Sequence, residues 1–514
     1  MRFIKNIKTI CCAALLLGSM SSCSDWLDVK MEDNVMENTL FSTNEGYQVA
    51  LNGVYLSLVD LYANNLTAGA IDVMAQYYNV TENNNHTYKV YAGYKFDDTQ
   101  FESFRDNVWT KAYELIANTN VILEHCAEEG NALKKEHAPI VKGEALALRA
   151  LLHFEMLRLF GPVYNAENAS VKCIPYNLSS SKDIQPLLPA SEVMDYIIAD
   201  LTEAASLMKT ADPIVTEGIR NEEQNDNGLG NDFLNYRNLR LNYYAVQALL
   251  ARAYAWKGDM AKAYSICKND IIDKITTDEV EVFPWVTESQ IRVEGKPDYV
   301  FSSEVMFALY NTKRTSVFSS LFSPSLNAKS SRLTFVGSSF SDSKYTFFYD
   351  DENDWRREMW GVTESKPTED DTEVETSLYL LKFADFEQGT TASSTDLYRY
   401  MMPLVRLSEV YLLAAEGAPS REEGIGFINT LRKHRSCRDI ADNGEEMVQL
   451  VLNEFAREVI GEGQLFYFYK RHAMENIPSG TAVNATFGMT LSNYVLPLPP
   501  SETDKRVTIN NNSN

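Results

Sequence analysis

Apolar residues recur at helical spacing along several long segments of the chain, and this spacing predicts a mainly helical protein. In residues 143–163, GEALALRALLHFEMLRLFGPV, the apolar side chains follow the i, i+3, i+4, i+7 rhythm of one helix face. The rhythm stops at Gly161 and Pro162, a pair that breaks helices. Similar periodicity predicts helices in residues 109–126, 242–267, 403–417, 427–435 and 445–463.

Residues 242–267 carry the pattern of a tetratricopeptide-like helical hairpin. Small side chains at Ala251 and Ala263 let two helices approach closely, and Tyr254 fills the groove between them. Gly258 lies in the predicted turn between the helices. The sequence has one clear repeat of this kind, so we expect other helices to cover its apolar face.

Between residues 275 and 400 the pattern changes to short apolar runs separated by polar loops. The stretches DYVFSSEVMFALY (298–310) and SLYLLKF (377–383) predict short strands. Two polar stretches, residues 217–232 and 363–377, predict solvated loops. This part of the chain is therefore predicted to form short strands and loops attached to the helical part of the protein.

The first residues have the layout of a secretory signal. A positively charged start precedes an apolar run at residues 10–17, which is too short to span a membrane. Small residues then lead to Cys23 in GSMSSC, an arrangement typical of lipoprotein signals. We expect residues 1–22 to be removed and Cys23 to carry a lipid. The alternative is ordinary cleavage near Ser22.

We expect the mature chain, residues 23–514, to form a single domain, because helical segments occur on both sides of the loop-rich part. Its parts are an N-terminal part (23–235), the clearest hairpin (236–270), a loop-rich part (275–400) and C-terminal helices (400–500).

The charge and cysteine content narrow the possible partners and chemistry. A net charge of −24 repels phosphate backbones, and no basic cluster with interleaved aromatics is present, so nucleic-acid binding is disfavoured. The four cysteines beyond Cys23 have irregular spacing that matches no zinc motif. We expect these cysteines to be free thiols in the core. The alternative is that they form disulfides. They are Cys126, Cys173, Cys267 and Cys437.

The sequence carries none of the common catalytic or cofactor motifs. HExxH, GxSxG, GxGxxG and Walker loops are missing, and the six histidines show no ligand spacing. We therefore expect a non-enzyme without a cofactor. Residues 223–232 have a weak likeness to a calcium loop, but position 12 would be Leu234 instead of Glu. A flexible insertion is the better interpretation.

One segment, residues 70–98, combines tyrosines with amides and a carboxylate in a way that favours ligand binding. Aromatic faces stack on sugar rings, while polar groups bind the hydroxyls. The alternative is that TYKVYAGYKF (87–96) forms a core strand. A second aromatic patch lies at residues 344–360. The predicted ligand contacts are Asp72, Gln76, Tyr77, Tyr78, Asn79, Tyr91, Tyr94 and Trp355.

Several blocks in order resemble the SusD/RagB family of Bacteroidetes surface lipoproteins. They are CSDWLD, FSTNEGYQVALNGVY (41–55), the helix with Glu144, Arg149 and Arg158, the hairpin at 242–267, RLSEVYLLAAEG (406–417), EFAREVIGEGQ (454–464) and YVLPLPPSE (494–502). The sequence departs from the family pattern at Phe455, at Gln464-Leu465 and in its final residues, which indicates a divergent branch.

The resemblance implies both a fold and a role. The fold would be a core of tetratricopeptide-like hairpins with a loop-rich binding face. The role would be capture of a glycan, or of a peptide as in RagB, at the outer face of the outer membrane. The partner would be a SusC-like TonB-dependent barrel transporter. The alternatives are a helical scaffold that binds no ligand and a surface glycoside hydrolase.

Overall fold

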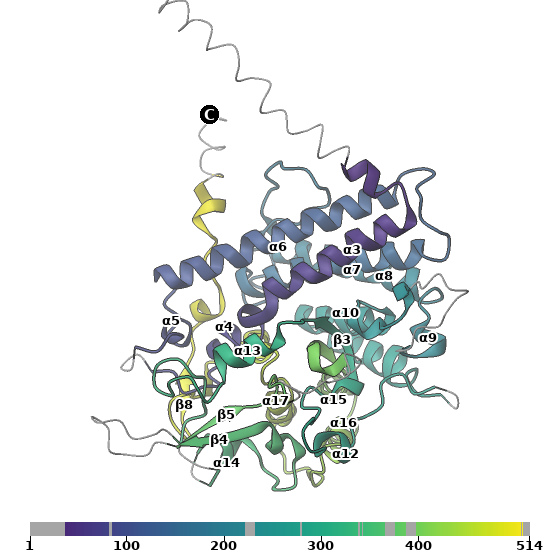
Figure 1. Ribbon diagram of the computed structural model, residues 1–514. Helices are drawn as coiled ribbons and strands as arrows, with labels where there is room; N and C mark the ends of the chain where they lie inside the picture. Colours follow the sequence, from purple (N-terminus) through teal and green to yellow (C-terminus); the bar gives the residue numbers. More distant parts are fainter. Residues whose placement is uncertain are drawn as a thin grey trace, which may run out of the picture.

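The long helices of the N-terminal half form one side of the molecule. In the computed structural model, α3 (Asn44–Leu61), α6 (Thr99–Cys126), α7 (Ala138–Phe160) and α8 (Ala190–Met208) lie together in the upper part of Figure 1. The pairs α3 with α6, α6 with α7 and α7 with α8 are in contact. The structure describes residues 36–81, 85–220, 232–277, 280–337, 340–341, 343–364, 376–386, 397–504 and 506.

Local signals explain where these helices begin and end. The Asp98 side chain accepts a hydrogen bond from the N–H of Gln100 (2.8 Å) and caps the start of α6. Helix α7 has proline in its first turn and ends at Gly161, so the predicted end of this helix is confirmed. Nearly every side chain along α7 is buried, as expected for a central helix that other elements surround.

The predicted hairpin is present and joins the N-terminal helices to the C-terminal ones. Helix α10 (Tyr243–Lys257) ends at Gly258 in the left-handed conformation, and α11 (Met260–Ser265) follows directly. Helix α10 contacts α8, and α11 contacts α15 (Leu407–Gly417). Neighbouring helices thus cover the apolar face of the hairpin, as the sequence predicted.

The remaining helical elements are shorter or lie in the C-terminal part. The α-helices are α4 (Ala70–Met74), α5 (Lys89–Ala92), α9 (Ile214–Glu217), α12 (Glu288–Ile291), α13 (Arg314–Leu321), α14 (Lys344–Phe348), α16 (Arg421–Lys433), α17 (Met447–Glu458) and α18 (Leu465–Arg471). The 3-10 and π turns are η1 (Tyr62–Leu66), η2 (Asp232–Leu234), η3 (Arg237–Leu239), η4 (Ile266–Ile272), η5 (Ser302–Glu304), η6 (Trp355–Met359), η7 (Leu397–Tyr400) and η8 (Leu491–Tyr494).

The strands pair two by two in antiparallel fashion and form no larger sheet among the described residues. The pairs are β1 (Lys172–Ile174) with β2 (Leu188–Pro189), β3 (Val305–Tyr310) with β6 (Met401–Arg406), β4 (Trp360–Glu364) with β5 (Thr376–Leu380), and β7 (Asn476–Pro478) with β8 (Thr486–Gly488). Strands β3 and β5 confirm the two predicted strands. The fold is mainly α, as predicted.

A buried ion-pair network holds the C-terminal part together. The Glu458 carboxylate accepts hydrogen bonds from Arg356 (3.0 Å), Arg406 (2.9 Å) and Arg435 (2.8 Å). All four side chains are almost fully buried. Because each charge has an opposite partner, the network fixes α17 against the segments around it.

Residues far apart in sequence are also joined in the core. The Asp72 carboxylate accepts hydrogen bonds from the N–H groups of Gly461 (2.7 Å) and Gly463 (3.0 Å). These glycines form the turn between α17 and α18, so α4 of the N-terminal part is tied to the C-terminal helices.

Two further findings concern the thiols and membrane-spanning helices. The four cysteines are free thiols, three of them buried and Cys126 half-buried. No helix in the described ranges has the length and apolar character needed to cross a membrane. The leader, Cys23 and the calcium-loop candidate up to residue 231 lie outside the described residues.

Candidate functional site

A cavity of about 390 Å³ lies between α14, α17, α18 and the β7–β8 hairpin. In Figure 1, α14, α17 and β8 lie in the lower part of the molecule, on the side away from α3 and α6. The walls of the cavity come from these four elements, together with Tyr77 just after α4. We name this space the α14–α17 cavity.

Aromatic side chains form part of the cavity wall. Tyr77 and Phe348 meet edge to face with their ring centroids 6.1 Å apart, and Tyr469 lines the same space. The Tyr77 hydroxyl donates to the carbonyl of Ala456 on α17 (2.6 Å), which fixes the ring. Phe347 also lines the cavity and is 61% exposed, so its ring is accessible to a ligand.

Polar side chains surround these rings. Helix α17 presents Gln449 and Asn453, and the β7–β8 hairpin presents Asn476, Asn484 and Thr486, all of them solvent-exposed. Amides and hydroxyls both donate and accept hydrogen bonds, as sugar hydroxyls do. The cavity thus offers apolar ring faces and neutral polar groups side by side.

Lys344 places a buried ammonium group at the cavity wall. Its Nζ donates to the carbonyls of Gln76 (2.6 Å), Tyr77 (3.1 Å) and Ser479 (3.1 Å). Burial lowers the pKa of this amine to about 7. The lysine belongs to the second aromatic patch of the sequence, which also supplies Phe347 and Phe348 to the cavity.

Among the predicted contacts, Tyr77 is the residue that the structure places in the cavity. Asp72 instead lies in the core beneath, where it accepts hydrogen bonds from the N–H groups of Gly461 and Gly463. Burial raises the pKa of the Asp72 carboxyl to about 8, although the two N–H groups and Lys382 act in the opposite direction. Its position gives it a structural role, so the predicted contact between Asp72 and a ligand is corrected.

None of the four predicted tyrosines has an exposed ring face, since even Tyr77 at the cavity wall is 1% exposed. Tyr78 is 2% exposed, and Tyr91 and Tyr94 are 7% exposed. Tyr91 packs among Phe101 and Phe104, and each ring has aromatic neighbours within 6.0 Å. A ring covered by protein leaves no surface for a sugar. The prediction that Tyr78, Tyr91 and Tyr94 stack on a ligand is therefore corrected.

The alternative of a core strand at residues 87–96 was right about burial and wrong about conformation. This stretch forms the short helix α5 and turns, and Tyr94 has a positive φ of 52°. A strand would place alternate residues on opposite faces, whereas here the chain folds back on itself. The hydroxyl of Tyr94 donates to the carbonyl of Met74, which holds α5 against α4.

The other predicted contacts, Gln76, Asn79 and Trp355, lie outside the cavity lining. The Gln76 side chain donates to the carbonyl of Ala92 (2.8 Å). The N–H of Asn79 donates to the carbonyl of Thr334 (2.7 Å), and that of Trp355 to the carbonyl of Arg435 (3.0 Å). None of these three side chains is among the described residues that line the α14–α17 cavity.

The polar residues that line the cavity were not among the contacts predicted from the sequence. The β7–β8 hairpin lies in ENIPSGTAVNATFG (475–488), a stretch rich in Asn, Ser, Thr and Gly. Such composition is typical of an exposed turn, and it was the available signal. The contribution of α17 gave no signal, because Gln449 and Asn453 look like ordinary solvent-facing helix residues.

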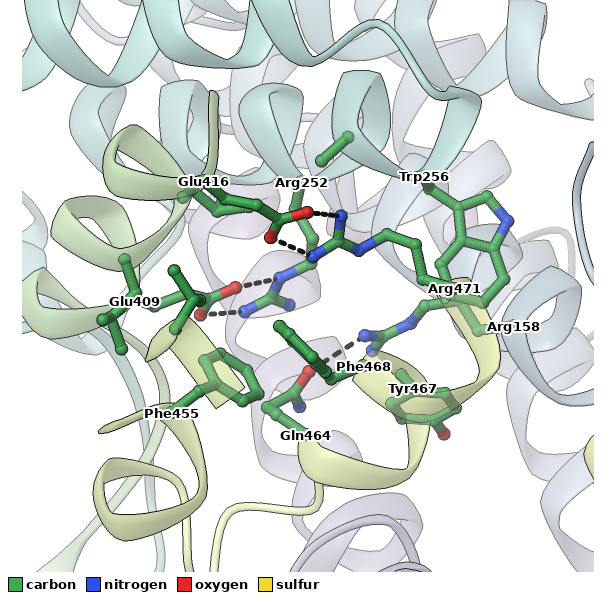
Figure 2. Close-up of a pocket in the computed structure, with 14 residues that line it drawn as sticks. Arg158, Arg252, Trp256, Glu409, Glu416, Phe455, Gln464, Tyr467, Phe468 and Arg471 are labelled. Carbon is green, nitrogen blue, oxygen red and sulfur yellow. Dashed lines mark hydrogen bonds and ion pairs between the residues drawn. The ribbon is translucent and has the colours of Figure 1, made fainter. Parts of the chain in front are cut away.

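A smaller cavity between α7, α10, α15, α17 and α18 is less suited to a ligand. Its volume is about 40 Å³, enough for a few water molecules. Figure 2 shows Arg252 facing Glu409 and Arg471 facing Glu416, each with two hydrogen bonds of 2.6–2.7 Å. Because these charges satisfy one another, the cavity is part of the helix-packing interface.

A third hollow of about 490 Å³ lies beside α3 and β3. It is lined by tyrosines, amides and the exposed Leu56. Its Arg240 donates to Glu144 (3.1 Å) and also to Asn52, so this cation is already engaged. We name this space the α3 hollow, and it offers a comparison site for the α14–α17 cavity.

No cluster of metal-ligating side chains occurs in the part of the chain that the structure describes. Buried carboxylates of this region are held by cations or by backbone N–H groups, as Glu462 is by Lys382 (2.6 Å) and Asp72 by Gly461 and Gly463. A glycosidase needs two carboxyl groups across the scissile bond, and none lines the α14–α17 cavity among the described residues.

Comparison with known protein families gives two matches along the chain. A model described as "Starch-binding associating with outer membrane" matches residues 25–215. A model described as "SusD family" matches residues 298–514. Together the two matches cover both the helical N-terminal part and the elements around the α14–α17 cavity.

Individual relatives agree with these matches. The chain is 26% identical over 205 residues to SusD-like protein P38 of Formosa agariphila. The aligned segment covers 40% of this chain and 38% of that relative. A SusD superfamily structure from Bacteroides thetaiotaomicron has a TM-score of 0.63 at 21% identity, over 90% of this chain and 98% of the other. A SusD-like carbohydrate binding protein from Bacteroides vulgatus has a TM-score of 0.62 at 17% identity, over 90% and 96%. These structures share the fold.

Proposed function

The chain belongs to the SusD/RagB family, and from this premise we propose that it binds an oligosaccharide in the α14–α17 cavity without altering it. The bound ligand then passes to a SusC-like TonB-dependent barrel in the outer membrane. A lipid on Cys23 tethers the protein to that membrane, with the helical body facing the exterior. No nucleic acid and no cofactor takes part.

The observation that carries this proposal is the mixture of groups around one cavity of ligand size. A volume of about 390 Å³ falls within the range of small-ligand sites. Phe347 and the half-buried Phe348 offer ring surface, while the hairpin and α17 offer amides and hydroxyls. Each stacked ring and each hydrogen bond contributes modestly, so we expect an affinity near the micromolar range. Weak binding permits release into a transporter.

The test uses two exposed apolar residues in different hollows. Phe347 in the α14–α17 cavity is 61% exposed and Leu56 in the α3 hollow is 65% exposed, so replacing either by alanine leaves the core intact. We expect Phe347→Ala to weaken oligosaccharide binding about tenfold, as loss of a stacking ring does. We expect Leu56→Ala to change nothing. Isothermal titration with ligands found on a glycan array measures both.

Other results would point to other functions. If Leu56→Ala weakens binding and Phe347→Ala does not, the ligand occupies the α3 hollow. Binding of peptides in place of glycans would identify a peptide receptor of the RagB type. Release of shorter sugars from a polysaccharide would identify a hydrolase. Complex formation with the barrel but no saturable ligand would identify a scaffold.

A further inference from the structure

The α14–α17 cavity has a charge pattern opposite to that of the whole chain. The sequence contains 71 acidic and 47 basic residues, yet no aspartate or glutamate lines this cavity among the described residues. Its two charged lining residues are Lys344 and Arg457, both cations. The charged residues that line the cavity are therefore cations, whereas the protein as a whole is acidic.

The two cations differ in how their charges are balanced. Arg457 donates to Glu454 (2.7 Å) and is paired with Asp350 (3.2 Å), so carboxylates behind the wall neutralise it. Lys344 is held by three carbonyl oxygens alone in the part of the chain that the structure describes. Carbonyl dipoles solvate an ammonium group but leave its net charge in place. When protonated, Lys344 is therefore the cavity's cation without a carboxylate partner among the described residues.

We propose that the α14–α17 cavity selects saccharides that carry carboxylate or sulfate groups. This inference rests on the proposed function, because it names the class of sugar that the same cavity takes. The three protons of the Lys344 ammonium are used by the three carbonyls, so the lysine acts on the ligand through its charge. The cavity is open to solvent, so this charge attracts an anionic ligand over several ångströms and added salt screens the attraction. The exposed amides of Asn476 and Asn484 can bind neutral hydroxyls.

The charge state of Lys344 responds to the ligand. Its pKa is lowered to about 7 because burial removes water from the ammonium group. An anion beside the cavity wall favours the protonated form, so a carboxylated or sulfated sugar stabilises the charge that attracts it. A neutral sugar gains nothing from this interaction, and a cationic sugar is repelled.

The first experiment compares matched ligands. Oligogalacturonides and their methyl esters form the carboxylate pair, and carrageenan oligosaccharides with their desulfated forms make the sulfate pair. Maltohexaose and chitosan oligosaccharides serve as neutral and cationic probes. We expect at least one charged member to bind at least ten times tighter than its neutral counterpart at low salt, and added NaCl to remove this difference.

The outcomes separate this inference from the proposed function. Equal or tighter binding of the neutral members would overturn the anionic selectivity and leave oligosaccharide binding standing. If no saccharide of any charge binds, the proposed function fails and the selectivity fails with it. The pair that responds identifies whether the sugar carries carboxylates or sulfates.

The second experiment uses a matched pair of buried lysines. Lys470 on α18 donates to the carbonyls of Arg158 and Gly161 (both 2.7 Å), and burial lowers its pKa to about 7, but it does not line the cavity. We expect Lys344→Met to lose about tenfold or more of the preference for the charged sugar. Lys470→Met should lose stability to a similar extent and keep the preference.

Loss of the preference in both variants, or in neither, would overturn the assignment to Lys344. If Lys344→Met does not fold, the salt dependence of the unmodified protein decides the matter. A charged sugar whose affinity is insensitive to NaCl would contradict a role for the lysine charge.

Discussion

Tyr77 and Tyr78 are neighbours in the chain and both are buried, yet they serve different purposes. Tyr77 borders the α14–α17 cavity and donates its hydroxyl to Ala456. Tyr78 packs against Phe322 with ring centroids 5.7 Å apart and lies away from the cavity lining. One ring therefore shapes a wall, and the other fills the core beneath it.

This difference predicts distinct effects for the two tyrosines. Tyr78→Ala leaves a void in the core and should lower the free energy of unfolding by about 3–5 kcal/mol. Protein that remains folded should bind ligand as before. Tyr77→Phe keeps the ring and loses one hydrogen bond, which costs about 1 kcal/mol. Urea unfolding measures stability, and titration with the ligand measures binding. A stable Tyr78→Ala variant with impaired binding would contradict the core assignment.

The sequence allowed part of the candidate site to be found at this scale. The aromatic patches at 70–98 and 344–360 supplied Tyr77, Lys344, Phe347 and Phe348. A tyrosine that stacks on sugar and a tyrosine that stacks on phenylalanine look alike in sequence, so Tyr91 was misassigned. Which face of a ring meets solvent depends on contacts between distant segments, and a single sequence does not contain these.

At the level of elements, the turn between α17 and α18 connects the cavity to the rest of the core. Gly463 in this turn has a φ of 70°, and a Cβ here would overlap the carbonyl of Leu66 in η1. Gly444, just before α17, has a similar φ of 79°, but a Cβ there would meet no neighbouring atom within 4 Å. The two glycines share a backbone conformation and differ only in the space around them.

Replacing each glycine by alanine should separate these two requirements. Gly444→Ala meets only the left-handed backbone cost, about 1 kcal/mol. Gly463→Ala must in addition push η1 away from the turn, and we expect a loss of about 3 kcal/mol or more. Thermal or urea unfolding of the two variants gives the comparison. Equal losses would show that the contact with Leu66 relaxes freely.

Elements with a strong local pattern could be predicted, and those set by tertiary contacts could not. The periodic segments at 138–160 and 243–257 form helices that end where Gly161 and Gly258 lie. Residues 87–96 alternate like a strand but form α5 and turns, because burial of Tyr91 and Tyr94 against other helices outweighs local preference. The pairing of β7 with β8 was likewise not predicted, because the stretch that contains both strands has the polar composition of a turn.

Across the whole molecule, buried carboxylates depend on arginine partners for their charge. Burial alone would raise the pKa of Glu454, but Arg356, Arg457 and Arg432 outweigh it and lower the pKa to about 2. Arg471 and His472 likewise lower the pKa of buried Glu416 to about 2. These charges exist in the folded state at pH values where the unfolded chain is already protonated.

The protein should therefore lose stability in acid. A carboxylate whose pKa is depressed on folding contributes stability above its unfolded pKa, near 4.5, and loses it as the pH falls toward 2. We expect the free energy of unfolding to fall by several kcal/mol between pH 5 and pH 3. Asp72, whose pKa is raised to about 8, opposes this trend, because its protonation as the pH falls from 8 toward 4 favours the folded state. Urea titrations at pH 5, 4 and 3 measure the slope, and a free energy of unfolding that increases as the pH falls from 5 to 3 would contradict the network's role.

The bond between Asp72 and Gly461 spans 389 residues, and it sets a condition on synthesis. During synthesis Asp72 is made long before the two glycines whose N–H groups donate hydrogen bonds to it. In the native fold this carboxylate is buried, and its two N–H donors belong to Gly461 and Gly463 near the end of the chain. Nascent chains that terminate short of this turn would keep an open core, and cellular proteases would remove them.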